Sequence, residues 1–135
     1  MHKQTFTGMF INLQHIGDFV GLTAEKAGLD ETAVYAVQLA VDEACTNIIE
    51  HAYGGESLGE ISISTTVTPE SFVVEIHDHG QPFDPDLIPV PNTNLPLDEI
   101  QPRGVGLFLM RKMMDEVRFK FEPNLGNTLT MVKYL

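Results

Sequence analysis

The amino-acid sequence predicts an α+β fold, a two-layer sandwich in which a mixed, mostly antiparallel sheet carries three helices on one face. Apolar residues recur every three or four positions in three segments, which is typical of amphipathic helices. In other segments they alternate with polar residues, which is typical of half-buried strands. The order is strand, helix, helix, two strands, a long loop, helix and two strands, and 135 residues suit a single domain, 1-135.

The N-terminal part of the chain predicts a strand followed by two helices. Residues 4–10 are β-permissive, and the apolar positions of residues 13–27 have helical spacing. Asp30 is a suitable N-cap for a second helix over about residues 31–53, which the pair Gly54-Gly55 ends. This second helix contains the first candidate functional residues.

The remainder of the chain predicts two strand pairs separated by a loop and a helix. Alternation in residues 59–69 and 71–80 predicts an antiparallel pair. Residues 81–103 contain six of the eight prolines and have no helical or strand period, so we expect a lid or binding loop there. Residues 104–117 are predicted to form a helix, and residues 118–135 a closing hairpin.

The composition limits the classes of binding partner and the cellular compartments that are expected for this protein. With 19 acidic and 8 basic residues, the formal charge of -11 disfavours nucleic acid and anionic membranes as partners. The start of the chain lacks the apolar segment of a signal peptide, and no apolar run approaches the roughly 18 residues of a membrane span. Cys45, the one cysteine, falls on the apolar side of its helix and is predicted to be a core residue. We therefore expect a soluble, cytoplasmic protein.

The second predicted helix contains three polar residues at four-residue spacing beside its apolar face. Glu43, Asn47 and His51 form a slanting file along one margin of the apolar face. A glutamate can accept a proton, and an amide oxygen is a ligand that suits Mg²⁺, so the file is compatible with phosphoryl transfer to a hydroxyl. The alternative is that all three are solvated side chains of an ordinary amphipathic helix.

Three glycine-containing segments could complete a nucleotide site. Asp78 at a strand end could accept a hydrogen bond from an adenine amino group, and Gly80 would let the flat base come close. Gly104 and Gly106 open a helix, where free backbone N–H groups favour phosphates. The segment 126–128 lies between the last two strands. Taken alone, each segment is equally compatible with an ordinary turn or a loop-to-helix junction.

In this order, the segments resemble the GHKL superfamily of ATPases and kinases, which has a histidine-kinase-like ATP-binding fold. The stretches LAVDEACTNIIEHAYGG, DHGQPFDP, RGVGLFLMRKMMDEV and NTLTMVK are similar to its N box, two glycine boxes and last strand. Within the superfamily, the chain most resembles bacterial anti-sigma regulatory factors with serine/threonine kinase activity. The resemblance covers nearly the whole chain.

The resemblance implies roles for the residues that match the N box and the first glycine box. Glu43 would be the general base for the attacking hydroxyl, Asn47 the Mg²⁺ ligand, and His51 a phosphate-side or structural residue. Asp78 would bind the adenine N6 amino group, with Gly80 shaping the base pocket. ATP and Mg²⁺ are thus the implied cofactors.

Roles for the C-terminal residues follow from the same resemblance. Gly104, Val105 and Gly106 would cradle the phosphates, and Arg103 would meet the β- or γ-phosphate. Thr128 would support the base through its hydroxyl group or a water molecule. The implied substrate is a serine or threonine of a STAS-type anti-anti-sigma protein, the implied alternate partner is a sigma factor, and a homodimer is expected.

Some features depart from the family pattern or leave other functions open. Pro82 stands where many members have a second glycine, and the Pro-rich lid is poor in basic residues, so a stiffer hinge and weak ATP affinity are expected. A binding module that holds ATP without turnover would share the same residues. A detached histidine-kinase domain would need a phospho-accepting helix, which this chain lacks. The pair His77 and His79 has no third ligand for zinc.

Overall fold

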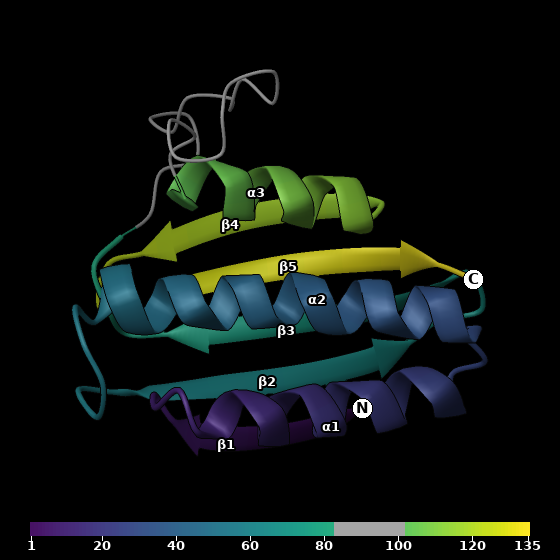
Figure 1. Cartoon of the computed structure of the whole chain (residues 1–135), viewed down its shortest axis with the longest axis horizontal. Helices are drawn as coiled ribbons and strands as arrows, with labels where there is room; N and C mark the ends of the chain where they lie inside the picture. The colour runs from purple at the N-terminus through teal and green to yellow at the C-terminus, as the bar shows by residue number, and fades with distance from the viewer. Residues whose placement is uncertain (83–101) are drawn as a thin grey trace.

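The computed structural model describes residues 1–82 and 102–135, and it contains the element order that the sequence predicted. The predicted loop over residues 81–103 lies almost entirely outside the described residues. Figure 1 shows the elements in chain order. Their bounds are β1 His2–Thr7, α1 Asn12–Lys26, α2 Glu31–Asn47, η1 Ile48–Ala52, β2 Glu60–Val67, β3 Ser71–Asp78, α3 Pro102–Met113, β4 Glu116–Glu122 and β5 Gly126–Tyr134.

The strands form one sheet in the order β1-β2-β3-β5-β4. All four pairings are antiparallel. The sequence had predicted a mixed, mostly antiparallel sheet, and among the described residues the sheet is entirely antiparallel. Consecutive strands are joined by hairpins at β2–β3 and β4–β5. The chain passes from α3 into the edge strand β4, and β5 then lies between β4 and β3. This topology places the end of β3 against the start of β5, where Asp78 pairs with Asn127.

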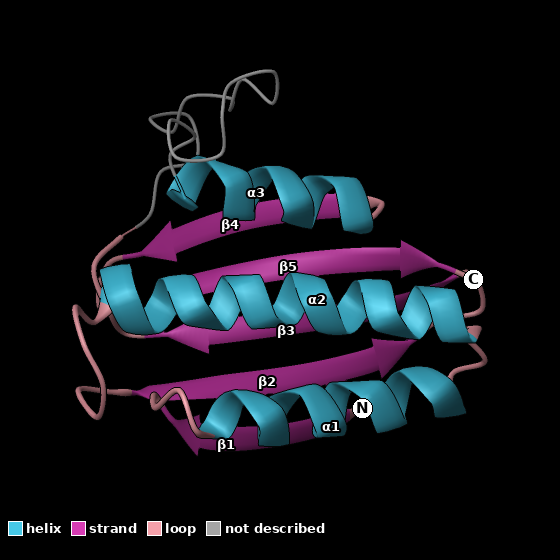
Figure 2. Ribbon diagram, viewed as in Figure 1, coloured by secondary structure: helices cyan, strands magenta, loops and turns pink. Residues whose placement is uncertain are grey.

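The three helices cover one face of the sheet, as predicted, and the core lies between the two layers (Figure 2). α2 crosses the middle of the sheet and packs against both α1 and α3. The fully buried side chains between the layers include Val37 and Val41 of α2 and Ile63, Phe72 and Ile76 of the sheet. Cys45 belongs to this core, and burial raises the pKa of its thiol, which agrees with the predicted packing role.

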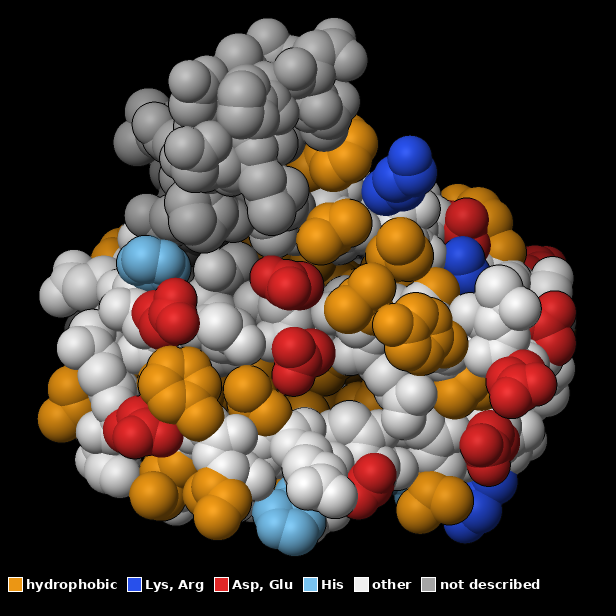
Figure 3. Space-filling view, viewed as in Figure 1, with side chains coloured by type: hydrophobic (Ala, Val, Ile, Leu, Met, Phe, Trp, Pro, Cys, Tyr) orange, Lys and Arg blue, Asp and Glu red, His pale blue; other side chains and the backbone are white. Residues whose placement is uncertain are grey.

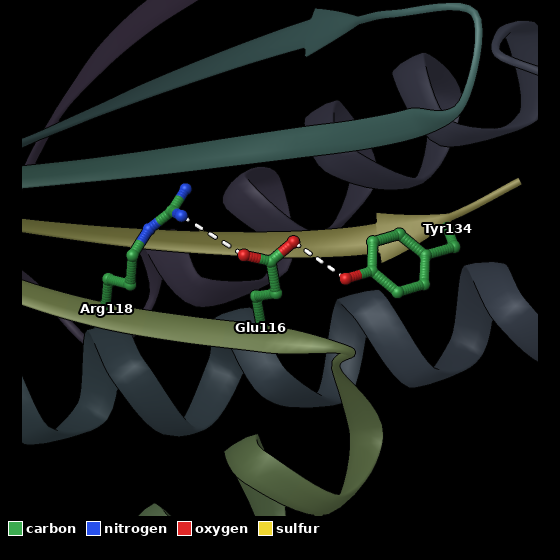
Figure 4. A network of polar contacts seen from close by, with 3 residues as sticks. All are labelled: Glu116, Arg118 and Tyr134. Carbon is green, nitrogen blue, oxygen red and sulfur yellow. Dashed lines mark hydrogen bonds and ion pairs between the residues drawn. The ribbon is translucent and has the colours of Figure 1, made fainter.

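The opposite face of the sheet is polar. Figure 4 shows its outer strands from that side, where Glu116 accepts hydrogen bonds from Arg118 and from the hydroxyl of Tyr134. These partners are exposed, so we expect each ion pair there to contribute little to stability. The candidate residues of the helical layer, Glu43, Asn47 and His51, are separated from this face by the sheet itself.

The second helix is not one continuous α-helix up to residue 53. Asp30 caps it as predicted, its Oδ1 accepting a hydrogen bond of 2.8 Å from the Ala33 N–H. After Asn47 the chain changes to the π-helix η1, in which the Tyr53 N–H donates to the Ile48 carbonyl five residues back. π-Turns often occur at functional sites. Because a π-turn holds more residues than an α-turn, the straight i, i+4 file expected for residues 43, 47 and 51 bends at this point.

No helix among the described residues is long and apolar enough to cross a membrane.

Candidate functional site

Asp78 lies at the end of β3 and is 4% exposed, although it carries a carboxylate. Its Oδ1 accepts two hydrogen bonds, at 2.8 Å from the Gly80 N–H and at 2.9 Å from Asn127 Nδ2. A buried carboxylate is costly unless hydrogen-bond donors compensate it, and these two donors do so. They also fix the orientation of the carboxylate, which is what recognition of a flat, hydrogen-bonding ligand requires.

Gly80 is held against the end of η1. A Cβ atom at this position would lie 2.5 Å from the Ala52 carbonyl oxygen and 2.7 Å from Ala52 Cβ, which leaves no room for a side chain. The Gln81 N–H donates to the same Ala52 carbonyl at 2.8 Å. The π-helix therefore forms one wall of the site beside Asp78, and the requirement for glycine is steric.

Glu43 and Asn47 meet α3 at Gly106. A Cβ atom on Gly106 would lie 3.0 Å from Glu43 Oε2 and 3.5 Å from Asn47 Nδ2. The N-box residues and the last predicted glycine thus come together from two helices. A carboxylate and an amide side by side at the start of α3 are suited to proton transfer and cation binding next to phosphates.

The half-buried position of Glu43 alters its acidity. Burial raises the pKa of the Glu43 carboxyl above its ordinary value, and the neighbouring carboxylates of Asp42 and Glu50 raise it further. A carboxylate with a raised pKa is a stronger base. The electrostatic environment is consistent with the general-base role expected for this residue.

A pocket joins the two groups of residues. Its walls contain Asn47 and His51 from the helix, Asp78 from β3, and Thr128 from β5. Apolar groups complete the walls, as in many small-molecule sites. The structure lines this pocket with Ala44, Asn47, Ile48, His51, Ala52, Asp78, Gln81, Pro82, Met110, Phe119, Lys120, Asn127, Thr128 and Leu129. Lys120 borders this pocket, but its ammonium group is exposed and pairs with Glu122 at 2.8 Å.

The Thr128 hydroxyl does not point toward Asp78. Its Oγ1 lies 3.1 Å from His77 Nδ1, a partner on the face of the sheet opposite to the Asp78 side chain. Successive side chains of a strand alternate between faces, so the preceding residue, Asn127, occupies the position beside the carboxylate. The sequence interpretation missed Asn127, and only the register of β5 against β3 could have identified it.

The residues expected to cradle the phosphates lie in the first turn of α3. Arg103, Gly104 and Val105 follow Pro102, with which the helix begins, so the predicted helix start is two residues late. Proline at the first position of a helix is common because its missing N–H would have no partner there. The side chains of these three residues are outside the described part of the structure, and the role of Arg103 stays a prediction.

No group of three or more His, Cys, Asp or Glu side chains that could hold a metal ion occurs among residues 1–82 and 102–135. The rings of His77 and His79 contact each other edge to face at 4.8 Å between centroids. In the described structure, these histidines pack against each other, and His77 also contacts Thr128.

Comparison with known proteins gives concordant results. Residues 12–133 match the model of the histidine kinase-like ATPase domain. The serine-protein kinase RsbW of Bacillus velezensis is 37% identical over 117 residues, which cover 83% of this chain and 71% of that protein.

Solved structures have the same fold at low sequence identity. The structure of the RsbU and RsbW domains of Rv1364c from Mycobacterium tuberculosis superimposes with a TM-score of 0.63 at 14% identity, over 98% of this chain and 32% of that one. The catalytic domain of the histidine kinase ThkA has a TM-score of 0.57 at 13% identity, with 99% and 97% of the two chains covered.

Proposed function

The chain belongs to the histidine kinase-like ATPase domain family, and from this premise we propose that it is an ATP-dependent serine/threonine protein kinase that acts as an anti-sigma regulatory factor. Similarity to serine-protein kinase RsbW over most of the chain supports the assignment. The observation that carries it is the convergence of Glu43, Asn47 and Gly106 beside a pocket that ends at buried Asp78. We expect the protein to act in the cytoplasm, alternately binding a sigma factor and a STAS-type anti-anti-sigma protein, and to form a homodimer.

The residues present fit a magnesium-nucleotide complex. ATP would supply the γ-phosphoryl group, and Mg²⁺ would neutralise the charge on the phosphate oxygens during transfer. Asp78 would accept a hydrogen bond from the adenine amino group, and Asn47 would hold the metal through its amide oxygen. The N–H groups at the start of α3 would bind phosphate oxygens.

Glu43 would take the proton from the hydroxyl of the partner protein as that oxygen attacks the phosphoryl group. A carboxylate positioned as a general base contributes about 10²- to 10⁴-fold to rate. Its raised pKa helps it to hold the proton that it accepts. Charge favours placement of the nucleotide by α3, because this helix contains Arg103, Arg111 and Lys112 and no Asp or Glu. Lys and Arg side chains appear over α3 in Figure 3, and carboxylates are spread over the remaining helical face.

The proposal is tested by transfer of labelled phosphate from ATP to a purified STAS-domain partner from the same organism. Glu43→Gln should lower the transfer rate by about 10²- to 10⁴-fold. Binding of a non-hydrolysable ATP analogue, measured by calorimetry, should remain. The matched control is Glu50→Gln, an exposed acid on η1 that should retain transfer.

Two outcomes would argue against the kinase. Unchanged transfer by Glu43→Gln would remove the general-base role. A Glu43→Ala protein that still regulates its partner normally would favour a binding module in which ATP only orders the docking face. Loss of Mg²⁺-dependent analogue binding in Asn47→Ala and in Asp78→Asn would instead support the assigned nucleotide site.

A further inference from the structure

We propose that Asn127 is the positioning residue for adenine recognition, fixing the Asp78 carboxylate and the backbone of Gly80 and Gln81 in one arrangement. This inference rests on the proposed function, because it assigns the base-binding end of the nucleotide pocket. The sequence gives Asn127 no special status, since it is the middle residue of the Gly126 to Thr128 turn-like segment.

The Asn127 side chain is surrounded by acceptors. Its Nδ2 lies 2.9 Å from Asp78 Oδ1, 3.1 Å from the Gly80 carbonyl oxygen and 3.1 Å from the Gln81 carbonyl oxygen. Three acceptor oxygens require the amide nitrogen, not the amide oxygen, on this side. One side chain thereby links the carboxylate to the backbone that follows it.

The Gly80-Gln81 dipeptide has a partner for each of its backbone polar groups. The Gly80 N–H donates to Asp78 Oδ1, and the Gln81 N–H donates to the Ala52 carbonyl, each at 2.8 Å. The two carbonyls accept from Asn127. A segment with all four groups satisfied inside the protein does not reorganise without losing hydrogen bonds. The dipeptide is therefore a fixed anchor.

Gly126, which precedes Asn127, lets the start of β5 lie close to the end of β3. Gly126 has a φ of 97°, which favours glycine, and a Cβ there would lie 2.3 Å from the Asp78 carbonyl oxygen. The start of β5 can thus approach the end of β3 closely enough for the Asn127 side chain to reach Asp78. Removal of the amide would leave Gly80 N–H as the remaining donor described at Asp78 Oδ1, and the carboxylate could rotate.

The experiment measures affinities for non-hydrolysable ATP and GTP analogues by calorimetry on the whole chain. Asn127→Ala should weaken ATP binding by about tenfold, the effect of a hydrogen bond to a charged group, and should lower the preference for ATP over GTP. Asn127→Ser retains a donor and should recover part of both quantities. The rate of phosphate transfer at saturating ATP should change little, because Glu43 and Asn47 lie at the other end of the site.

A matched control separates positioning from stability. Asn12, the first residue of α1, donates through Nδ2 to the Thr7 carbonyl at 2.8 Å, so Asn12→Ala removes a similar bond outside the pocket. It should leave the ATP to GTP preference unchanged, even where thermal unfolding shows a comparable loss of stability. Equal losses of preference in Asn12→Ala and Asn127→Ala would overturn the inference.

The remaining outcomes distinguish this inference from the proposed function. Absence of ATP binding by the wild type would overturn both. If Asp78→Asn loses ATP binding but Asn127→Ala retains wild-type affinity and preference, the nucleotide site stands and the positioning role of Asn127 is wrong.

Discussion

The two ends of the pocket are constructed in different ways. At the base end, Asp78, Gly80 and Gln81 are held by backbone groups and by one amide, with contacts too close for any added atom. At the reaction end, Glu43 and Asn47 meet Gly106 through side chains, and the charge state of Glu43 depends on its neighbours. The base end is therefore rigid because of its geometry, whereas the reaction end can be adjusted electrostatically.

The largest loss of stability is expected from Gly80→Ala at the base end. The new Cβ would collide with backbone and Cβ atoms of Ala52, which cannot move without displacing η1. Overpacking of this kind costs about 1 to 3 kcal/mol of unfolding free energy, measured by chemical denaturation. ATP binding should weaken by about tenfold or more, because the hydrogen bond from Gly80 to the carboxylate is disturbed. A stable Gly80→Ala protein with full ATP affinity would contradict the rigid description.

Gly106→Ala at the reaction end should separate stability from activity. Its Cβ would approach the end of a flexible side chain, Glu43, so we expect the carboxylate to shift and transfer to slow by about tenfold, as small misplacements do. Stability should be unchanged or higher, because alanine is favoured over glycine in a helix by about 0.8 to 1 kcal/mol.

Gly17→Ala is the control for this prediction. Gly17 lies inside α1, and a Cβ there would contact nothing within 4 Å. This variant should gain helix stability without loss of transfer. If both alanine variants retained full transfer, the position of Glu43 against α3 would not matter for the rate.

The pH dependence of transfer should reveal the adjustable charge at Glu43. Asp42→Asn removes the larger of the two neighbouring charge effects, so the pKa of Glu43 should fall and the acid limb of the pH-rate profile should move to lower pH. Glu50→Gln should move it in the same direction by less. A profile that either variant leaves in place would assign the acid limb to another group.

The raised pKa of Glu43 also determines the direction in which stability changes with pH. The folded protein holds the Glu43 proton more tightly than the unfolded chain, because the pKa is raised on folding. Ionisation of Glu43 therefore lowers stability as the pH rises through the folded-state pKa, and this loss is absent below the ordinary value. In Glu43→Gln, the loss of stability caused by ionisation of residue 43 should be absent from denaturation curves measured across the acidic range.

The smallest effect is expected from Thr128→Val. The hydroxyl bonds to His77 on the opposite face of the sheet, and valine retains the shape and strand preference of threonine. ATP affinity should stay within about twofold, the usual range of a surface substitution. A tenfold loss would instead restore the base-supporting role that the sequence resemblance implied for Thr128.

The sequence by itself determined the element order, the three-helix layer, the N-cap at Asp30 and the spacing of Glu43 and Asn47 along one helix. These features depend on local periodicity and on residue chemistry at short spacing, and both can be read from the sequence. It also identified Asp78 and Gly80 as neighbours in one glycine box. It could not show that every strand pair is antiparallel, because pairing joins residues far apart in the chain.

Only the tertiary structure decided which side chain stands beside Asp78. One residue of register separates Asn127, which faces the carboxylate, from Thr128, which faces His77, and strand alternation turns that single step into opposite faces of the sheet. The Ala52 carbonyl at the end of the π-helix Ile48–Ala52 likewise has a partner far along the chain, the Gln81 N–H. Local sequence sets which residues are available, and packing between distant segments sets which of them touch.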